Sequence, residues 1–265
     1  MEDLIHLQYL GQAGFVVETK TQKFVIDPYL SNYVVEGGIG SAEMFSREFP
    51  VPVQPDQLRG LQLAFITHDH ADHCDPLTLV PLLKSNPEML VIGTRTVADH
   101  LISEGVSAEK IIVPELDKLY DIKGTRFYTV PAAHYDFGKN EKGELAYFGF
   151  VIEVNGQWMY HSGDTILYDG MVESILRHTD QIRVACLPIN GRDGWRERMG
   201  MTGNLDAAET LQLAKLIKAD VILPMHNDLF KVNHVNPSVF VDIADRIAPR
   251  QKYHWLQPGE DFYLK

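Results

Sequence analysis

Thr67-His68-Asp69-His70-Ala71-Asp72-His73 places three imidazoles and two carboxylates within seven residues. An apolar run of strand length at 61–66 comes directly before it, and Cys74-Asp75-Pro76 after it is typical of a turn into a helix. We therefore expect these side chains on a loop at the end of a buried strand, where a rigid sheet can hold them in a fixed geometry. Neutral imidazole and carboxylate are ligands that zinc, manganese and iron accept. The stretch predicts a metal site rather than an ordinary polar loop.

Length, charge and cysteine content narrow the class of protein. The chain has 265 residues, enough for one large α/β domain, and a net charge of −12 from 36 acidic and 24 basic residues. Bulk charge would not attract a polyanion to such a surface, so we expect no nucleic-acid partner. The two cysteines suit a reducing cytoplasm, and neither a transmembrane run nor a signal peptide at the acidic Met1-Glu2-Asp3 is expected. We predict a cytoplasmic protein without membrane association.

The first sixty residues divide into a strand-rich part and a long connection. Short strands are expected at 5–10, 15–18 and 23–26. The third strand ends at Asp27, which is either a turn former or a neighbour of the metal site. Residues 31–60 form a long connection, which is either a surface excursion with a short helix near 41–48 or a lid. We favour the lid, because its aromatic side chains would need something to cover.

The rest of the chain alternates between expected helices and strands. Helices are expected at 76–83, up to 104 after a cap at Thr94 or Thr96, and at 171–177, 205–217 and 237–247; strands are expected at 89–92, 111–113, 126–130, 147–154, 157–161, 183–187 and 221–223. We expect His100 on the exposed face of its helix. The chain has no repeat and no linker-like segment, so we predict a single α/β domain over residues 1–265 with two sheet layers and outer helices.

Three later strands also end at a residue that can bind a metal ion. His134 follows the strand at 126–130, Asp164 follows the strand at 157–161, and His226 follows the strand at 221–223. Each of them alone is more often a satisfied polar residue. Together with the stretch at 67–73, they indicate one shared metal centre.

The combined pattern resembles the metallo-β-lactamase fold superfamily. The box H-x-H-x-D-H is intact, and the later single ligands follow in the order of that family. The resemblance implies a four-layer αβ/βα sandwich of two mixed β-sheets with outer helices and the site at one edge. It further implies that His68, His70 and His134 hold one metal, that Asp72, His73 and His226 hold a second, and that Asp164 bridges the two.

Two bound dications suit hydrolytic chemistry. The expected cofactor is a pair of divalent ions, Mn²⁺ or Zn²⁺ with Fe²⁺ also possible, whose charge Asp72, Asp164 and a metal-bridging hydroxide partly offset. Such a hydroxide is a nucleophile at neutral pH, because the ions lower the pKa of water from ~16 to about 7. We assign Asp72 a catalytic role, in which it orients the hydroxide or passes on its proton. The general prediction is a metal-dependent hydrolase.

Several stretches are similar to the L-ascorbate-6-phosphate lactonase group. They include Gly11-Gln12-Ala13-Gly14, Asp27-Pro28-Tyr29, the box itself, Leu187-Pro188-Ile189-Asn190-Gly191-Arg192-Asp193 and Pro224-Met225-His226-Asn227-Asp228. The resemblance implies opening of the lactone of a phosphorylated sugar acid, hence a small anionic substrate, and a homo-oligomer as in related enzymes. The alternative is a phosphodiesterase, of the phospholipase D type or acting on nucleotides, with the same dinuclear centre. A lipid enzyme should show an apolar groove beneath 31–60.

Residues 190–204 contain the candidate substrate contacts Asn190, Arg192 and Asn204. The planar guanidinium of Arg192 suits a phosphate or carboxylate, so we expect it to contact the substrate. Asn190 follows a strand and is also typical of a turn, and for Asn204, which precedes the helix at 205–217, the helix cap is the favoured role. Asp69 is expected to point away from the metals, because its neighbours on both sides are ligands.

Overall fold

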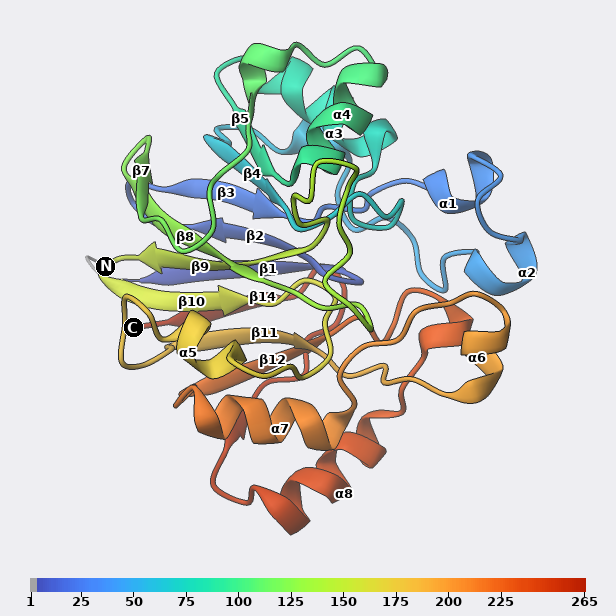
Figure 1. The fold of residues 1–265 in the computed structure, drawn as a ribbon, viewed down its shortest axis with the longest axis vertical. Helices are drawn as coiled ribbons and strands as arrows, with labels where there is room; N and C mark the ends of the chain where they lie inside the picture. The colour runs from blue at the N-terminus through green and yellow to red at the C-terminus, as the bar shows by residue number, and fades with distance from the viewer. Residues whose placement is uncertain (1–3) are drawn as a thin grey trace.

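Two β-sheets packed face to face form the centre of the molecule (Figure 1). The computed structural model describes residues 4–265, and Met1, Glu2 and Asp3, on which the expected absence of a signal peptide rests, lie outside it. In the described part the first sheet has seven strands, in the spatial order β14 (Asp261–Leu264), β1 (Ile5–Gly11), β2 (Gly14–Glu18), β3 (Lys23–Ile26), β4 (Leu63–Ile66), β5 (Leu90–Gly93) and β6 (Ile111–Ile112). The second has seven, in the order β13 (Lys252–Tyr253), β12 (Val221–Met225), β11 (Val184–Pro188), β10 (Gln157–His161), β9 (Phe148–Val154), β8 (Thr125–Pro131) and β7 (Tyr120–Ile122).

Helices cover the outer face of each sheet. On the first sheet lie α3 (Pro76–Ser85) and α4 (Arg95–Ser103); on the second lie α5 (Met171–Ile175), α7 (Ala207–Leu216) and α8 (Pro237–Ile247) (Figure 1). Separate apolar clusters fill the space between each sheet and its helices, and a third fills the space between the sheets. The predicted four-layer α/β sandwich is confirmed. The single-domain organisation of residues 1–265 stays a prediction.

Strand direction brings many strand ends to one edge of each sheet. Both sheets are mixed: β1, β2 and β3 pair antiparallel, whereas β3 to β6 pair parallel. In the second sheet β7 to β10 pair antiparallel and β10 to β13 pair parallel. It follows that β1, β3 and β4 end at one edge of the first sheet, and that β8, β10, β11 and β12 end at one edge of the second. The loops that leave these ends carry the polar residues described below.

The core between the sheets fixes the strand that carries the histidine box. Phe65 of β4 is fully buried, and its ring centroid lies 5.0 Å from that of Phe127 and 5.1 Å from that of Phe150, both in edge-on contact. Burial of one such phenylalanine stabilises the fold by about 1.5–3 kcal/mol. Because β8 and β9 supply the two partner rings, β4 is held rigidly against the second sheet immediately before the box.

Local signals account for most element boundaries. Asn155 and Gly156 both have left-handed φ values, 48° and 74°, as a two-residue Asn-Gly hairpin between β9 and β10 requires. Asp75 caps α3 by accepting a hydrogen bond from the Leu77 N–H, and Thr94 caps α4 through the Val97 N–H. These predicted boundaries are confirmed. Within residues 4–265, none of the helices has both the length and the apolar character needed to cross a bilayer.

Several short elements were not predicted. They are β7, β13, β14, the helices α1 (Tyr33–Glu36) and α6 (Gly194–Arg198), and the 3-10 turns η1 (Pro55–Gln57), η2 (Ala108–Lys110) and η3 (Lys231–Asn233). The expected helix near 41–48 is confirmed only as the single turn of α2 (Ala42–Phe45). In Figure 1, α1, α2 and α6 lie on the side of the molecule at which β4, β10 and β12 end.

Candidate metal centre

The seven predicted ligands come together where the two sheet edges meet. His68, His70, Asp72 and His73 follow β4, His134 follows β8, Asp164 follows β10, and His226 follows β12. They form two neighbouring groups: His68, His70, His134 and Asp164, and Asp72, His73 and His226. Within each group, one ligand atom from every residue lies within 4.8 Å of the others. The grouping matches the two ligand sets implied by the resemblance.

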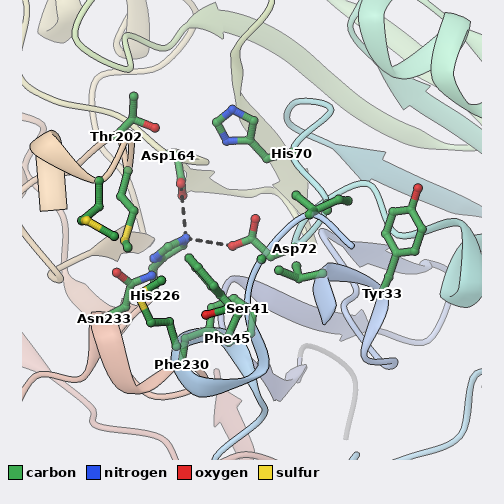
Figure 2. A pocket seen from close by; sticks show the side chains of 18 of the residues that line it. Tyr33, Ser41, Phe45, His70, Asp72, Asp164, Thr202, His226, Phe230 and Asn233 are labelled. Carbon is green, nitrogen blue, oxygen red and sulfur yellow. Dashed lines mark ion pairs between the residues drawn. The ribbon is translucent and has the colours of Figure 1, made fainter. Parts of the chain in front are cut away.

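Asp164 lies between the groups. Its Oδ2 atom is 3.5 Å from His134 Nε2 in the first group and 3.2 Å from His226 Nε2 in the second. Figure 2 shows the Asp164 carboxylate and that of Asp72 directed at the His226 ring from two sides. A carboxylate in this position can bind one ion with each oxygen, so the geometry suits the bridging role expected of Asp164.

The residues fit a bound cation. His68 Nε2, His73 Nε2 and Asp164 Oδ1 are buried and have no hydrogen-bond partner among the described residues. Buried polar atoms normally have hydrogen-bond partners, so a cluster of unpaired imidazole nitrogens and a carboxylate oxygen is typical of a site that binds a cation. A divalent ion that accepts nitrogen and oxygen ligands would satisfy all three atoms.

Buried neighbours orient two of the imidazoles. His73 Nδ1 lies 2.8 Å from Asp27 Oδ2, which leaves Nε2 to face Asp164 Oδ1 at 3.3 Å. His68 Nδ1 lies 2.9 Å from the Thr67 hydroxyl, which leaves its Nε2 free. Asp27 also accepts hydrogen bonds from the Thr67 N–H and hydroxyl, at 2.8 and 2.6 Å. Asp27 therefore forms the turn that follows β3 and also orients a ligand of the metal site, so both roles that the sequence left open apply.

His134 is presented as a neutral imidazole. Its Nδ1 donates to the Gly203 carbonyl at 3.0 Å, which directs Nε2 towards Asp164 and the Thr202 hydroxyl. Burial lowers the pKa of His134 to about 4, and burial together with the neighbouring His73 lowers that of His68 well below its usual range. A metal ion requires the neutral form, so neither residue must lose a proton at neutral pH to act as a ligand.

The second group holds charge differently. Burial alone would lower the pKa of His226, but Asp164 and Asp72 outweigh it and raise the pKa to about 9. Burial alone would raise the pKa of Asp164, but His226 and His73 outweigh it and lower the pKa well below its usual range. Without a metal ion, the site therefore balances its two carboxylates with protons on imidazoles. A dication would replace those protons.

The turn between β1 and β2 supplies a site residue that sequence reasoning missed. Gln12 is fully buried, and its Nε2 lies 2.6 Å from Asp72 Oδ2 and 3.0 Å from His226 Nε2. The turn itself is held in place, because the Gln12 carbonyl accepts from the His226 N–H and the Gln12 N–H donates to Asp228 Oδ1 at 3.0 Å. Gly11-Gln12-Ala13-Gly14 indicated a turn, but no periodic signal in it shows that a glutamine side chain enters the metal site.

His161 links this turn to the Asp164 loop. Its Nε2 donates to the Ala13 carbonyl at 2.8 Å, and its Nδ1 accepts from the Gly163 N–H at 3.2 Å. Gly163 has a φ of 59°, and a Cβ there would lie 2.8 Å from that of Thr67. Glycine is therefore required for Asp164 to approach the box so closely.

We predict that Gln12→Leu weakens metal binding in the second group. The variant loses the amide that holds Asp72, and loss of such an outer contact commonly lowers metal affinity by about 10–100-fold. Titration of the metal-free protein with Zn²⁺ by calorimetry would measure the change. Gln22→Leu is the matched control, since Gln22 is also buried but donates to the Glu153 carbonyl at 3.0 Å, away from the ligands. Equal loss of affinity in both variants would mean that Gln12 acts only through overall stability.

The structure places the predicted substrate contacts at 190–204 outside the lining of the cavity. The Arg192 guanidinium forms a bidentate pair with Glu209 at 2.6 and 2.7 Å and also donates to the Asn204 carbonyl at 3.0 Å. Asn204 is buried and donates to the Asn190 side chain at 3.1 Å, and it does not cap α7, whose N-cap is Asp206. None of the three lines the cavity at the metal centre. Their side chains hold the loop together instead.

A cavity of about 520 Å³ opens over the two groups. The segment 31–60 contributes Tyr33, Val34, Met44 and Phe45 to its wall, so this segment does cover the site, as we expect of a lid. Figure 2 shows Phe45, Phe230 and Tyr33 arranged around the ligand side chains. The cavity also corrects one prediction: the half-buried His100 lines it, although we expected His100 to face solvent. Asp69 lines the cavity too but belongs to neither ligand group, in agreement with the expectation that it points away from the metals.

Comparison with other sequences gives the class of the protein. The fold, the two ligand groups and the relatives described here define a metal-dependent hydrolase of the αβ/βα sandwich type. A family model described as a beta-lactamase superfamily domain matches residues 22–227, so the chain belongs to the beta-lactamase superfamily. The UPF0173 metal-dependent hydrolase of Pelotomaculum thermopropionicum is 26% identical over 261 residues, covering 97% of this chain and 98% of the relative. That of Methanoculleus marisnigri is 29% identical over 260 residues, covering 97% and 95%.

Solved structures share the fold over nearly the whole chain. A metallo hydrolase from the archaeon Ignicoccus hospitalis superposes with a TM-score of 0.71 at 22% identity, covering 99% of both chains. An isothiocyanate hydrolase from Delia radicum gut bacteria superposes with a TM-score of 0.75 at 20% identity, covering 97% of this chain and 98% of that one. At these identities the likeness concerns the fold alone.

Proposed function

We propose that this protein hydrolyses a carboxylic ester or lactone at a centre of two divalent ions. The single observation that carries the proposal is the position of Asp164, whose carboxylate faces imidazoles of both ligand groups at 3.2–3.5 Å. His68, His70 and His134 would hold one ion, and Asp72, His73 and His226 would hold the other. Mn²⁺, Zn²⁺ or Fe²⁺ would accept this donor set. When bound, the ions would supply an activated water molecule and polarise the carbonyl oxygen of the ester or lactone.

Asp72 is the proposed proton carrier. Its side chain is 17% exposed and faces the cavity, whereas that of Asp164 is 4% exposed. Gln12 Nε2 holds Asp72 Oδ2 at 2.6 Å, so the carboxylate keeps one orientation. In this proposal Asp72 accepts a proton from the attacking water and returns it to the alkoxide that leaves when the acyl–oxygen bond breaks.

The predicted substrate, a phosphorylated sugar lactone, is supported only in part. The lactone bond suits the proposed chemistry, and the narrower resemblance to L-ascorbate-6-phosphate lactonases supports it. The phosphate group, however, would find no Lys or Arg among the described residues that line the cavity. We therefore propose ester or lactone hydrolysis without a requirement for the phosphate.

A phosphodiesterase remains the second candidate. One observation favours it: apolar side chains of the segment 31–60, among them Val34, Met44 and Phe45, line the cavity, as expected for an enzyme that accepts a lipid chain. The same pair of ions could polarise a phosphoryl oxygen.

A substrate panel tests the proposal. Metal-free protein would be reloaded separately with Mn²⁺, Zn²⁺ and Fe²⁺ and offered an alkyl lactone, a sugar-phosphate lactone, a phosphodiester and a small isothiocyanate. We expect at least one ion to restore lactone hydrolysis and the metal-free protein to have none. If the reloaded protein cleaves the phosphodiester or the isothiocyanate but no lactone, the ester assignment is wrong and the hydrolase class stands.

The proposed setting follows from the same features. We propose a small-molecule substrate, no nucleic-acid or membrane partner, a cytoplasmic location and a homo-oligomer. The net charge of −12 supports the absence of a nucleic-acid partner, and two buried cysteines without a disulfide support the cytoplasmic location.

A further inference from the structure

We infer that the cavity selects a neutral substrate whose apolar substituent lies between the α1–α2 segment and the loop that follows α6. The inference rests on the proposed hydrolytic function and names the substrate class for the same site. It differs from the sequence-based expectation of a small anionic substrate. Two independent features of the cavity carry it: the apolar side chains of its walls and the absence of Lys and Arg among the described residues that line it.

Apolar side chains from three segments line the cavity. Val34, Met44 and Phe45 come from the α1–α2 segment, Met199 and Met201 follow α6, and Phe230 follows β12. Met199 is 53% exposed and Ile39, at the rim, is 59% exposed. Large exposed apolar side chains gathered around a polar centre gain stability when a ligand removes them from water. Methionine adapts its shape to varied ligands, which suits a site for alkyl or aryl groups.

The α1–α2 wall is anchored to the body of the protein. The Val34 N–H donates to the Tyr29 hydroxyl at 3.1 Å, and the Phe45 ring packs edge-on against Phe230 at 5.4 Å. The Glu48 N–H donates to the Leu229 carbonyl at 2.9 Å. The apolar wall is therefore held in a defined position over the ligands, and its composition can govern which substituent fits.

The charges around the cavity disfavour an anion. Among the described lining residues there is no Lys or Arg, whereas Asp69, Asp72 and Asp164 all line it. Asp72 and Asp164 belong to the ligand groups, so an anionic substituent away from the ions would meet Asp69 and apolar side chains, with no Lys or Arg of the described lining to pair with. Moving a charge out of water without such a partner is costly.

The nearby arginines are engaged elsewhere. Arg47 donates to the Tyr29 carbonyl at 2.9 Å, Arg192 pairs with Glu209, and Arg196 pairs with Asp193 at 2.7 Å. Arg198 of α6 is exposed and does not line the cavity. Each of these guanidinium groups is therefore either committed to a protein partner or outside the cavity wall.

Binding of lactams tests the substrate class without hydrolysis. The probes are five-membered ring amides with alkyl chains of increasing length, each matched by a probe whose chain ends in a carboxylate, titrated by calorimetry into Zn²⁺-loaded protein. We expect each added methylene to tighten Kd by up to about fourfold until the cavity is filled, the value for full burial of one methylene. The carboxylate probe should bind about tenfold more weakly than its methyl-ended match, because its charge loses water without gaining a partner. Equal or tighter binding of the carboxylate probe, or no dependence on chain length, would overturn the inference.

A charge placed in the wall should reverse the preference. Met201→Arg is expected to shift the ratio of neutral to anionic affinity by about fivefold or more towards the anion, as expected for a partly desolvated charge pair. Leu216→Arg at the end of α7 adds the same charge at an exposed apolar position outside the cavity and should leave the ratio unchanged. Met44→Arg repeats the test from the α1–α2 segment if Met201→Arg does not fold. An unchanged ratio in a folded wall variant would contradict the inference, and a failure of lactone hydrolysis alone would contradict only the proposed function.

Discussion

Asp164→Ala protein is expected to retain less than about 1% of the wild-type hydrolytic rate, a larger loss than the 10–100-fold typical of outer-shell contacts. The physical reason is that one carboxylate faces both ligand groups, with its Oδ2 3.5 Å from His134 Nε2 and 3.2 Å from His226 Nε2. Its removal takes a ligand from both ions and leaves the surrounding imidazoles without their countercharge. Rate measurements at saturating metal, together with metal content after dialysis, would check the result.

The control for this variant is Asp169→Ala, which removes an exposed aspartate five positions further along the same loop. It should keep both its metal content and its rate. Two tightly bound ions in the Asp164→Ala protein would rule out the bridging role, whatever the effect on rate.

Asp27→Asn is expected to cost both stability and metal affinity. Asp27 is fully buried and accepts from the Thr67 N–H, the Thr67 hydroxyl and His73 Nδ1 at 2.6–2.8 Å. An amide turns one of these acceptors into a donor, which leaves a buried donor unpaired at a cost of about 1–3 kcal/mol in the free energy of unfolding. Because His73 also loses its orienting partner, affinity at the second group should fall by about 10–100-fold.

Chemical denaturation of the metal-free protein measures the first effect, and calorimetric titration with Zn²⁺ measures the second. Asp220→Asn is the control, because Asp220 pairs with Arg183 at 2.7 Å in a half-buried position that is distant from the ligands. This substitution should lower the free energy of unfolding by no more than about 1 kcal/mol. Unchanged metal affinity in Asp27→Asn would show that His73 needs no orienting partner.

The convergence of the candidate ligands could be predicted because they follow runs of strand length. β4 and β12 are buried at every residue, and β8 and β10 at most of theirs, so the strand ends were visible in the sequence shortly before His68, His134, Asp164 and His226. Strand direction then brings those ends together. The pattern that reveals each candidate ligand, a strand followed by His or Asp, is therefore local in the sequence.

Other features depend on partners that are distant in sequence. Arg192 has the chemistry of an anion contact, but Glu209 lies across the loop and takes both arms of its guanidinium. Gln12 lies 60 positions from Asp72, and nothing in its turn indicates that contact. The helix α1 is a single turn, too short to give a periodic pattern, so the position of its Tyr33 ring 6.4 Å from that of His100 was not foreseen.

The most direct test of the account is anomalous diffraction from crystals grown with Zn²⁺ or Mn²⁺. We predict two metal peaks per chain, about 3.5–4 Å apart as in other two-metal sites. One should lie at bonding distance from His68, His70 and His134, the other from Asp72, His73 and His226, and both from Asp164. A single ion, or two ions that leave Asp164 without a metal contact, would contradict the dinuclear centre on which the proposed hydrolysis depends.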